Sequence, residues 1–157
     1  NRCGVISGPG QFGKVDQGVF TLWVAHHYFK KPLRYTGFGG TGKQVRDLLH
    51  PNDLFDLVRR QVEKISGPST RIYNVGGGNM SSASLCELTT LCQAATGNTV
   101  SIQSASETTP VDVPFYVSDT RRVKQEFGWQ PQRNPRQIVE DITAWIRKNE
   151  TALRQIF

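Results

Sequence analysis

The strongest constraint on the fold is an alternation of β-prone and helical segments in the first half of the chain. β-prone segments are expected at residues 2–6, 45–49 and 71–75, and residues 18–29 and 51–67 between them carry apolar side chains at helical spacing. A helix that connects two strands of one sheet usually returns the chain parallel to the first strand. The alternation therefore predicts an α/β protein, with these three segments in one parallel sheet.

The second half of the chain is predicted to be mostly helical. Ser84 and Glu87 have the spacing of a capping box, which satisfies free amide groups at the start of a helix. Asp119 is expected to cap a short helix that ends at Gly128, and Asn134 is expected to cap the last helix. No internal repeat or linker divides the sequence.

The length and net charge of the chain limit the classes of protein to which it can belong. A chain of 157 residues is long enough for one compact domain with its own core. The net charge of +6 favours an anionic partner, but the basic residues are scattered, whereas a nucleic-acid-binding face is a dense basic stripe. No apolar stretch has the length of a transmembrane helix. We therefore expect neither nucleic acid nor a membrane among the partners.

The cysteines and histidines do not have the spacing of metal ligands. Three cysteines, an odd number, favour free thiols in the reducing cytoplasm. They are Cys3, Cys86 and Cys92. His26, His27 and His50 lack a third ligand or a nucleophile partner, so we expect packing or surface roles and no metal site.

Two glycine-rich segments resemble phosphate-binding loops. Residues 37–43 match the G-x-x-x-x-G-K pattern of a Walker loop, but Gln44 stands where a Ser or Thr would hold magnesium, and a β-prone segment follows. Residues 76–78 follow a strand, but Ser81 replaces the glycine that lets a dinucleotide-binding helix pack closely. Both segments are better interpreted as turns, the first of them between two strands.

Four motifs occur in the order found in the extended short-chain dehydrogenase/reductases, the NAD-dependent epimerase/dehydratase family. Residues 39–54 resemble that family's glycine turn, Arg-Asp pair, apolar residues and acidic helix start. Residues 2–9 resemble its strand and Gly-Pro segment, residues 73–76 its Tyr-Asn-x-Gly strand end, and residues 128–131 its Gly-Trp-x-Pro segment. Within the family, residues 2–18 are most similar to the subgroup of CDP-paratose (tyvelose) 2-epimerases.

The resemblance implies a two-part enzyme in which NAD lies on a parallel sheet and the sugar nucleotide lies under a smaller lobe. It assigns residues 1–8 and 45–78 to the carboxyl-terminal part of a Rossmann-type sheet, and residues 9–44 and 79–157 to a mostly helical substrate-binding lobe. The family's catalytic Tyr-x-x-x-Lys lies upstream of the matched region, and no tyrosine here is followed by Lys at that spacing. We therefore expect the carboxyl-terminal part of a longer enzyme, inactive alone, with NAD bound mainly by the other part.

The resemblance also implies how a diphosphate would be bound. Arg46 is expected to bind it through charge-assisted hydrogen bonds, and a structural ion pair with Asp47 or Asp53 is the alternative. The family's second diphosphate arginine is Thr109 here. We therefore expect the guanidinium of Arg46 to face a cleft, with no carboxylate close enough to neutralise it fully.

Further ligand contacts are carried over from the family. Tyr35, with Leu33, lies where the family sandwiches the base, and a core tyrosine is the alternative. Gln11, Phe12 and Gln17 fall on the loop around sugar and nucleotide, where core packing of Phe12 is equally plausible. The predicted substrate-binding residues are Gln11, Phe12, Gln17, Leu33, Tyr35, Arg46, Asn79, Thr109 and Asp112, the last of these at the ribose. The predicted cofactor-binding residues are Cys3 and Gly4.

The resemblance thus predicts the nucleotide-sugar-binding part of an NAD-dependent epimerase that is similar to the CDP-paratose 2-epimerases and acts by transient oxidation to a keto-sugar. A nucleotide-sugar 4-epimerase or 4,6-dehydratase is the alternative within the family. Outside these activities, the alternatives are a basic relative that binds nucleic acid without catalysis and a regulatory domain that binds a nucleotide without turnover. Homo-oligomerisation stays open.

Overall fold

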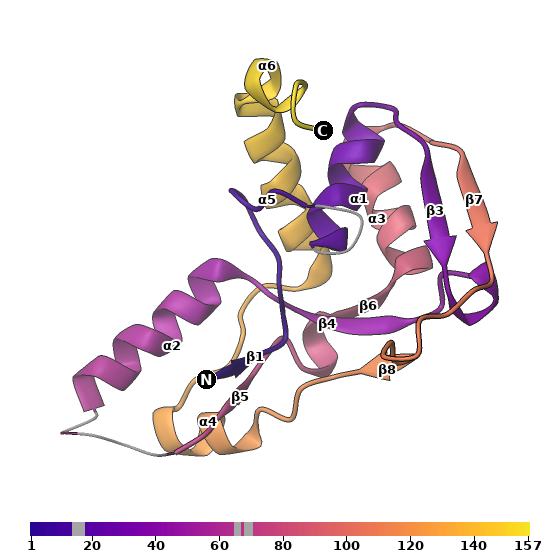
Figure 1. Cartoon of the computed structure of the whole chain (residues 1–157). Helices are drawn as coiled ribbons and strands as arrows, with labels where there is room; N and C mark the ends of the chain where they lie inside the picture. Colours follow the sequence, from indigo (N-terminus) through magenta and orange to yellow (C-terminus); the bar gives the residue numbers. More distant parts are fainter. Residues whose placement is uncertain (14–17, 65–66, 68–70) are drawn as a thin grey trace.

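A computed structural model describes residues 1–13, 18–64, 67 and 71–157 of the chain. Strand β4 (Val45–Leu49) crosses the middle of the molecule, and helices α1 (Val19–Tyr28), α3 (Leu85–Thr96) and α5 (Pro135–Lys148) pack together beside it (Figure 1). The remaining elements are β1 (Arg2–Cys3), β2 (Val5–Ile6), β3 (Leu33–Thr36), α2 (Pro51–Lys64), β5 (Asn74–Val75), β6 (Ser82–Ser84), β7 (Ile102–Ala105), β8 (Phe115–Tyr116), α4 (Arg121–Phe127) and α6 (Glu150–Leu153), with short 3-10 turns at Phe38–Gly40 and Asn79–Ser81. The predicted α/β class is confirmed.

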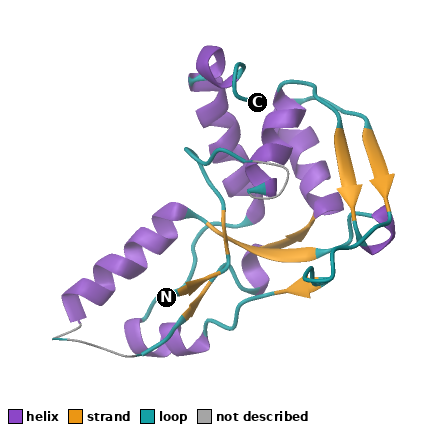
Figure 2. Cartoon of the chain, viewed as in Figure 1, coloured by secondary structure: helices purple, strands orange, loops and turns teal. Residues whose placement is uncertain are grey.

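Strand β4 separates two hydrophobic cores, because successive side chains of a strand point to opposite faces. Leu48 belongs to the larger core, formed with α1, α3 and α5, whereas Leu49 belongs to the smaller core, formed with α2, α4 and β5. Helix α5 buries Ile138, Ile142 and Ile146 completely in the larger core, and Trp145 is partly buried against it. Figure 2 shows the helices of the larger core grouped at one side of β4.

The first segment of the chain changes its partner at Gly4. Arg2 and Cys3 pair parallel with β5, and Val5 and Ile6 pair parallel with β4. The predicted parallel direction is confirmed, but the expectation of one continuous sheet is wrong, since the three segments form two separate ladders. The change of partner coincides with a close contact, because a Cβ at Gly4 would lie 2.8 Å from a carboxylate oxygen of the buried Asp47.

Three strands of the second half were not predicted. Strand β6 pairs antiparallel with β4, β8 pairs parallel with β4, and β7 pairs parallel with β3. The strands are short, and β7 and β8 are half-buried or exposed, so they lack the alternation of buried and exposed side chains that marks a strand in sequence. Most of the regular structure of the second half is nevertheless helical, in α3, α4, α5 and α6, as expected.

The helix ends follow the local sequence closely. Ser84 and Glu87 form the predicted capping box at the start of α3, and Asn134 forms a second one with Gln137 at the start of α5. Helix α4 departs from the prediction, because Asp119 accepts a hydrogen bond from the amide of Arg121 while Thr120 occupies the cap position. The second helix, expected over residues 51–67, is described as far as Lys64, and residues 65–66 lie outside the described residues.

The smaller core depends on a buried ion pair at the start of α2. The carboxylate of Asp53 is 2% exposed and accepts a 2.6 Å hydrogen bond from the guanidinium of Arg133. It also accepts hydrogen bonds from the amides of Gln132 and Arg133, and the indole of Trp129 donates to the carbonyl of Asp53. The segment before α5 is thereby fixed to α2.

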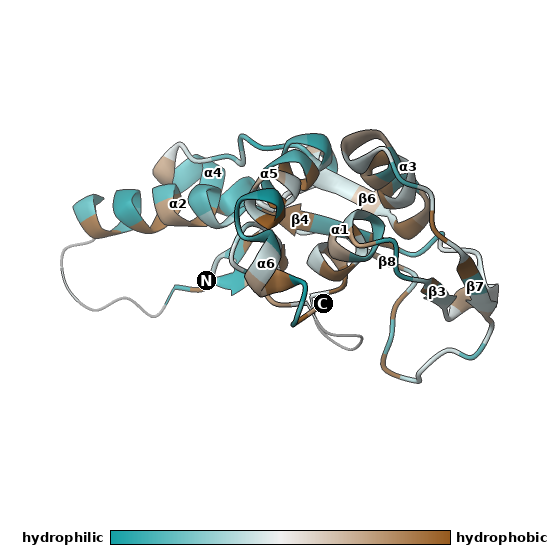
Figure 3. Cartoon of the chain, turned by 90° about the horizontal axis from the view of Figure 1, so that it is seen from above, coloured by the Kyte–Doolittle hydropathy of each residue, from teal (hydrophilic) through white to brown (hydrophobic). Residues whose placement is uncertain are grey.

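Helix α2 keeps part of its apolar surface exposed. Phe55, Val58 and Val62 are 68%, 41% and 75% exposed, and their spacing places them along one side of the helix. Figure 3 shows α2 projecting from the rest of the molecule, with hydrophobic stretches between hydrophilic ones. In the described ranges, no helix combines the length and apolar character that a membrane crossing needs.

Removal of the buried carboxylate tests the role of Asp53. Asp53→Ala should lower the free energy of unfolding by about 1–3 kcal/mol, because it leaves the amides of Gln132 and Arg133 without their acceptor and removes one of the two carboxylates near the guanidinium of Arg133. Asp56→Ala is the matched control on the same helix, since its ion pairs with Arg59 and Arg60 are more exposed, and it should cost less than about 1 kcal/mol. Equal losses in urea unfolding would contradict this account.

Acidification tests the buried histidine of α1. His27 is fully buried, its Nδ1 donates to the carbonyl of Trp23, and burial lowers the pKa of His27 below its ordinary value. The unfolded chain therefore binds a proton more readily than the folded one, so this contribution to stability is complete above about pH 6.5 and is lost as the pH falls below that value. Burial also lowers the pKa of His50, which adds to the effect.

The melting temperature should accordingly fall between pH 7 and pH 5, and the fall should be smaller in His27→Gln. His26→Gln is the control, because the neighbouring His26 is only partly buried and its ring hydrogen-bonds the carbonyl of Pro32. The same pH dependence in the wild type and in His27→Gln would show that His27 contributes nothing to it.

Candidate functional site

Arg46 lies on β4, with its side chain 19% exposed. Its guanidinium donates a 2.5 Å hydrogen bond to Oδ1 of Asp112 and a 2.8 Å hydrogen bond to the carbonyl of its neighbour Val45. The expectation that no carboxylate would neutralise Arg46 is therefore wrong. The predicted alternative partners were also wrong, because Asp47 lies on the other face of β4 and Asp53 pairs with Arg133.

The carboxylate of Asp112 comes from the loop between β7 and β8. Within this loop, the amide of Asp112 donates to the carbonyl of Thr109, and the amide of Val113 donates to the carboxylate of Asp112. Thr109 is exposed and contributes only its backbone to this turn. The loop is also attached to the glycine turn before β4, because the amide of Phe38 donates to the hydroxyl of Thr108. The structure thus brings together Arg46, Thr109 and Asp112.

Tyr35 is half-buried and packs against the larger core. Its ring stacks on Trp23 with centroids 5.6 Å apart, and its hydroxyl lies 2.7 Å from that of Thr89. The other contact is with Gly42, where a Cβ would lie 2.7 Å from the ring. These contacts favour the core interpretation of Tyr35, and Leu33 is likewise buried in this core. A glycine at position 42 is thus explained by packing, as expected for a turn between two strands.

The loop after β2 holds two predicted residues by contacts within the chain. The amide nitrogen of Gln11 donates to the carbonyl of Ile6, and its oxygen accepts from the hydroxyl of Thr21. Phe12 is 54% exposed, with its ring edge-on to Trp145. Gln17 lies outside the described residues, so the structure does not place it.

The predicted cofactor residues adjoin a buried polar cluster that was not predicted. Cys3 is exposed on β1, and Gly4 lies against the carboxylate of Asp47 and the hydroxyl of Ser118. Asp47 is fully buried and accepts hydrogen bonds from the amides of Gly78 and Ser118, both at 3.1 Å. The Arg-Asp pair in sequence was the available signal for this residue. Asn79 directly follows Gly78 and is exposed.

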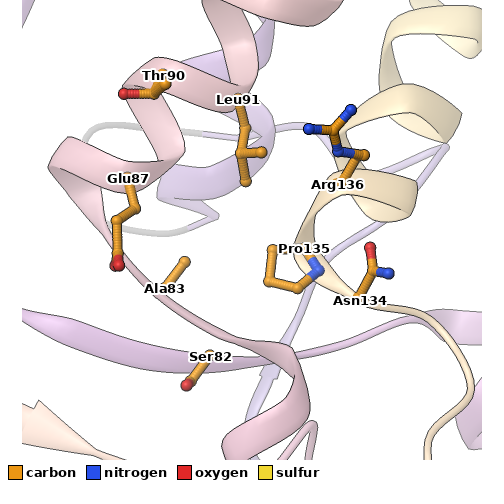
Figure 4. Close-up of a pocket in the computed structure, with 8 residues that line it drawn as sticks. All are labelled: Ser82, Ala83, Glu87, Thr90, Leu91, Asn134, Pro135 and Arg136. Carbon is orange, nitrogen blue, oxygen red and sulfur yellow. The ribbon is translucent and has the colours of Figure 1, made fainter.

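A cavity of about 500 Å³ lies between the first turns of α3 and α5 (Figure 4). It is lined by Ser82, Ala83, Glu87, Thr90, Leu91, Asn134, Pro135 and Arg136. No predicted site residue lines it, although Ala83 is the cross-strand neighbour of Arg46. The carboxylate of Glu87 is already used in the capping box of α3. Among the described residues, no cluster of His, Cys, Asp and Glu could hold a metal ion.

Comparison with known proteins gives the family. The profile of the NAD dependent epimerase/dehydratase family matches residues 1–76. The chain is 28% identical over 153 residues to a CDP-paratose 2-epimerase of Salmonella typhi, covering 92% of the chain and 43% of that protein. It is 31% identical over 111 residues to a UDP-glucose 4-epimerase of Neisseria meningitidis serogroup B, covering 70% of the chain and 31% of that protein.

A solved protein structure is also similar to this chain. The dTDP-glucose 4,6-dehydratase of Bacillus anthracis in complex with NAD superposes with a TM-score of 0.77 at 25% identity, covering 99% of this chain and 46% of that one. The chain therefore spans less than half the length of these relatives.

Proposed function

We propose that this chain, which belongs to the NAD-dependent epimerase/dehydratase family, forms the nucleotide-sugar-binding part of an NAD-dependent sugar-nucleotide epimerase. The observation that carries the proposal is the family match over residues 1–76, which includes Arg46. The guanidinium of Arg46 is partly exposed and lies beside the loop between β7 and β8 that carries Asp112. A CDP-linked sugar is the proposed substrate, because the similarity to a CDP-paratose 2-epimerase extends over 92% of the chain.

In this proposal, Arg46 binds the diphosphate of the substrate. A guanidinium offers two parallel N–H groups to phosphate oxygens, and such charge-assisted hydrogen bonds are about twice as strong as neutral ones. The other proposed contacts around the base and sugar are Gln11, Phe12, Gln17, Leu33, Tyr35 and Asn79. Tyr35 would act there through the edge of its ring, because the ring already packs on Trp23. The proposed role of Thr109 is limited to its backbone.

The cofactor is proposed to be NAD, which accepts a hydride from a sugar carbon and returns it after the keto-sugar has turned over. The described residues do not by themselves suit a dinucleotide. The glycine turn at 76–78 leads into a 3-10 turn and β6, whereas the pyrophosphate of a dinucleotide needs the start of a helix. Cys3 and Gly4 are proposed to contact only part of the cofactor.

The exposed side of α2 supports a division of the chain into two functional parts. Residues 1–8 and 45–78 would join a larger parallel sheet, which would cover the exposed Phe55 and Val62. Residues 9–44 and 79–157 would then form the substrate-binding lobe. The three cysteines are free, which supports a cytoplasmic location, and homo-oligomerisation stays open.

A nucleic-acid-binding role has less support. Several other arginines that could contact the phosphates of a nucleic acid are already paired within the chain. These are Arg59, Arg121 and Arg133. A UDP-sugar 4-epimerase or a 4,6-dehydratase remains the alternative within the family, and binding of UDP- or dTDP-sugars in preference to CDP-sugars would favour it.

Arg46→Ala in the full-length protein tests the proposed diphosphate contact. It should weaken CDP-sugar binding by about 1.5–3 kcal/mol, roughly ten- to a hundredfold, because it removes hydrogen bonds to a charged group. The melting temperature should change little, because partly exposed ion pairs contribute little to stability. Arg34→Ala is the control, since Arg34 lies on β3 and bonds only to Gln103. Unchanged affinity with a large drop in melting temperature would make Arg46 a structural residue.

A second measurement tests the proposed division of labour. Calorimetric titration of the 157-residue chain with NAD should give no binding in the micromolar range, because the described residues offer no helix start to the pyrophosphate. The full-length protein is the positive control. Micromolar NAD affinity of the 157-residue chain would contradict the proposal that another part holds the cofactor.

A further inference from the structure

The guanidinium that the proposed function assigns to a diphosphate is already bonded within the chain. Arg46 donates to the carboxylate of Asp112 at 2.5 Å and to the carbonyl of Val45 at 2.8 Å. A carboxylate oxygen and a phosphate oxygen are the same kind of acceptor for this group. A diphosphate can therefore bind the guanidinium of Arg46 in one of two ways. It displaces the carboxylate of Asp112, or it binds with that negative charge next to its own.

The carboxylate of Asp112 is held in this position by its own loop. The amide of Val113 donates to the same Oδ1 that accepts from Arg46, and the amide of Asp112 donates to the carbonyl of Thr109. Beyond the turn, the amide of Val45 donates to the carbonyl of Pro114, which fixes the loop beside the start of β4. The side chain of Asp112 therefore loses little conformational freedom when it pairs with Arg46.

The residue at position 109 of the same loop does not offset the charge of Asp112. Thr109 stands where the resemblance places a second arginine, so the loop brings a negative charge without the positive charge that would offset it. Arg46 and Asp112 together are neutral, and a diphosphate approaching the pair gains no net attraction from it.

We propose that Asp112 is an internal competitor for Arg46, which occupies the guanidinium in the ligand-free protein and lowers the affinity for nucleoside diphosphates. The proposal rests on the proposed function of Arg46, and it differs from the ribose contact that the resemblance assigns to Asp112. A ribose contact is lost when Asp112 is replaced, whereas a competitor is removed. The two roles therefore predict opposite changes in affinity.

The test is calorimetric titration of the full-length protein with CDP and, separately, with UDP. Asp112→Asn should bind the diphosphate about tenfold more tightly than the wild type, because it removes the negative charge. The asparagine oxygen can still accept from Val113, so the loop is retained. Asp119→Asn is the matched control, since Asp119 also forms an exposed ion pair, with Arg121 at 2.6 Å, and it should bind as the wild type does.

The double variant connects the effect to Arg46. In an Arg46→Ala background, Asp112→Asn should no longer increase the affinity tenfold, because there is no guanidinium left to release. Weaker or unchanged binding by Asp112→Asn alone would overturn the proposal, with weaker binding indicating a direct ligand contact. If Arg46→Ala binds CDP and UDP as the wild type does, the proposed function itself fails. If Arg46→Ala weakens binding and Asp112→Asn does not strengthen it, only the competitor role fails.

Discussion

The buried carboxylate of Asp47 is the interaction on which most of the arrangement depends. Burial of a charge is costly unless hydrogen bonds compensate for it, and here the amides of Gly78 and Ser118 both donate to the same oxygen. The chain also passes close to this carboxylate at Gly4 and Gly76, where a Cβ would lie within 2.8 and 2.1 Å of its oxygens. One side chain thus connects β4, the two ladders formed by β1 and β2, and the segment before α4. Any larger residue at these glycines would separate them.

The position of Asp47 determines the face of β4 to which Arg46 points. Consecutive residues of a strand point to opposite faces, so a residue that anchors the smaller core places its neighbour on the other face. Arg46 is therefore held by a strand whose own position is fixed by Asp47, Leu48 and Leu49, all of them buried. The Arg-Asp pair is in this sense one structural unit, in which Asp47 anchors the strand and Arg46 is the residue proposed to bind the diphosphate, and the rigidity of the first determines the placement of the second.

The starts of α3 and α5 could be predicted from sequence because their determinants are local. The capping box of Ser84 and Glu87 and the apolar spacing of α5 are both contained in a few consecutive residues. Strands β6, β7 and β8 could not be predicted, because each is defined by pairing with a strand distant in sequence, as Leu33 pairs with Ile102. The partner of Arg46 was missed for the same reason, since 66 residues separate it from Asp112. For Tyr35, no local pattern distinguishes a ring stacked on Trp23 from a ring available to a base.

Adaptation to a ligand must come from the loop and not from β4. Movement of Arg46 would disturb both cores, because Leu48 and Leu49 follow it closely on the same strand. The loop that carries Asp112 is exposed on both sides of that residue, with Val111 92% exposed and Val113 44% exposed, so its displacement uncovers little apolar surface. The bonds that hold it near Arg46 are an ion pair and a few exposed hydrogen bonds, each of them a small contribution to stability. Arg46 is thus a rigidly held cation, and Asp112 is an anion on a weakly attached loop. The charge that a ligand meets at this place depends on the position of that loop.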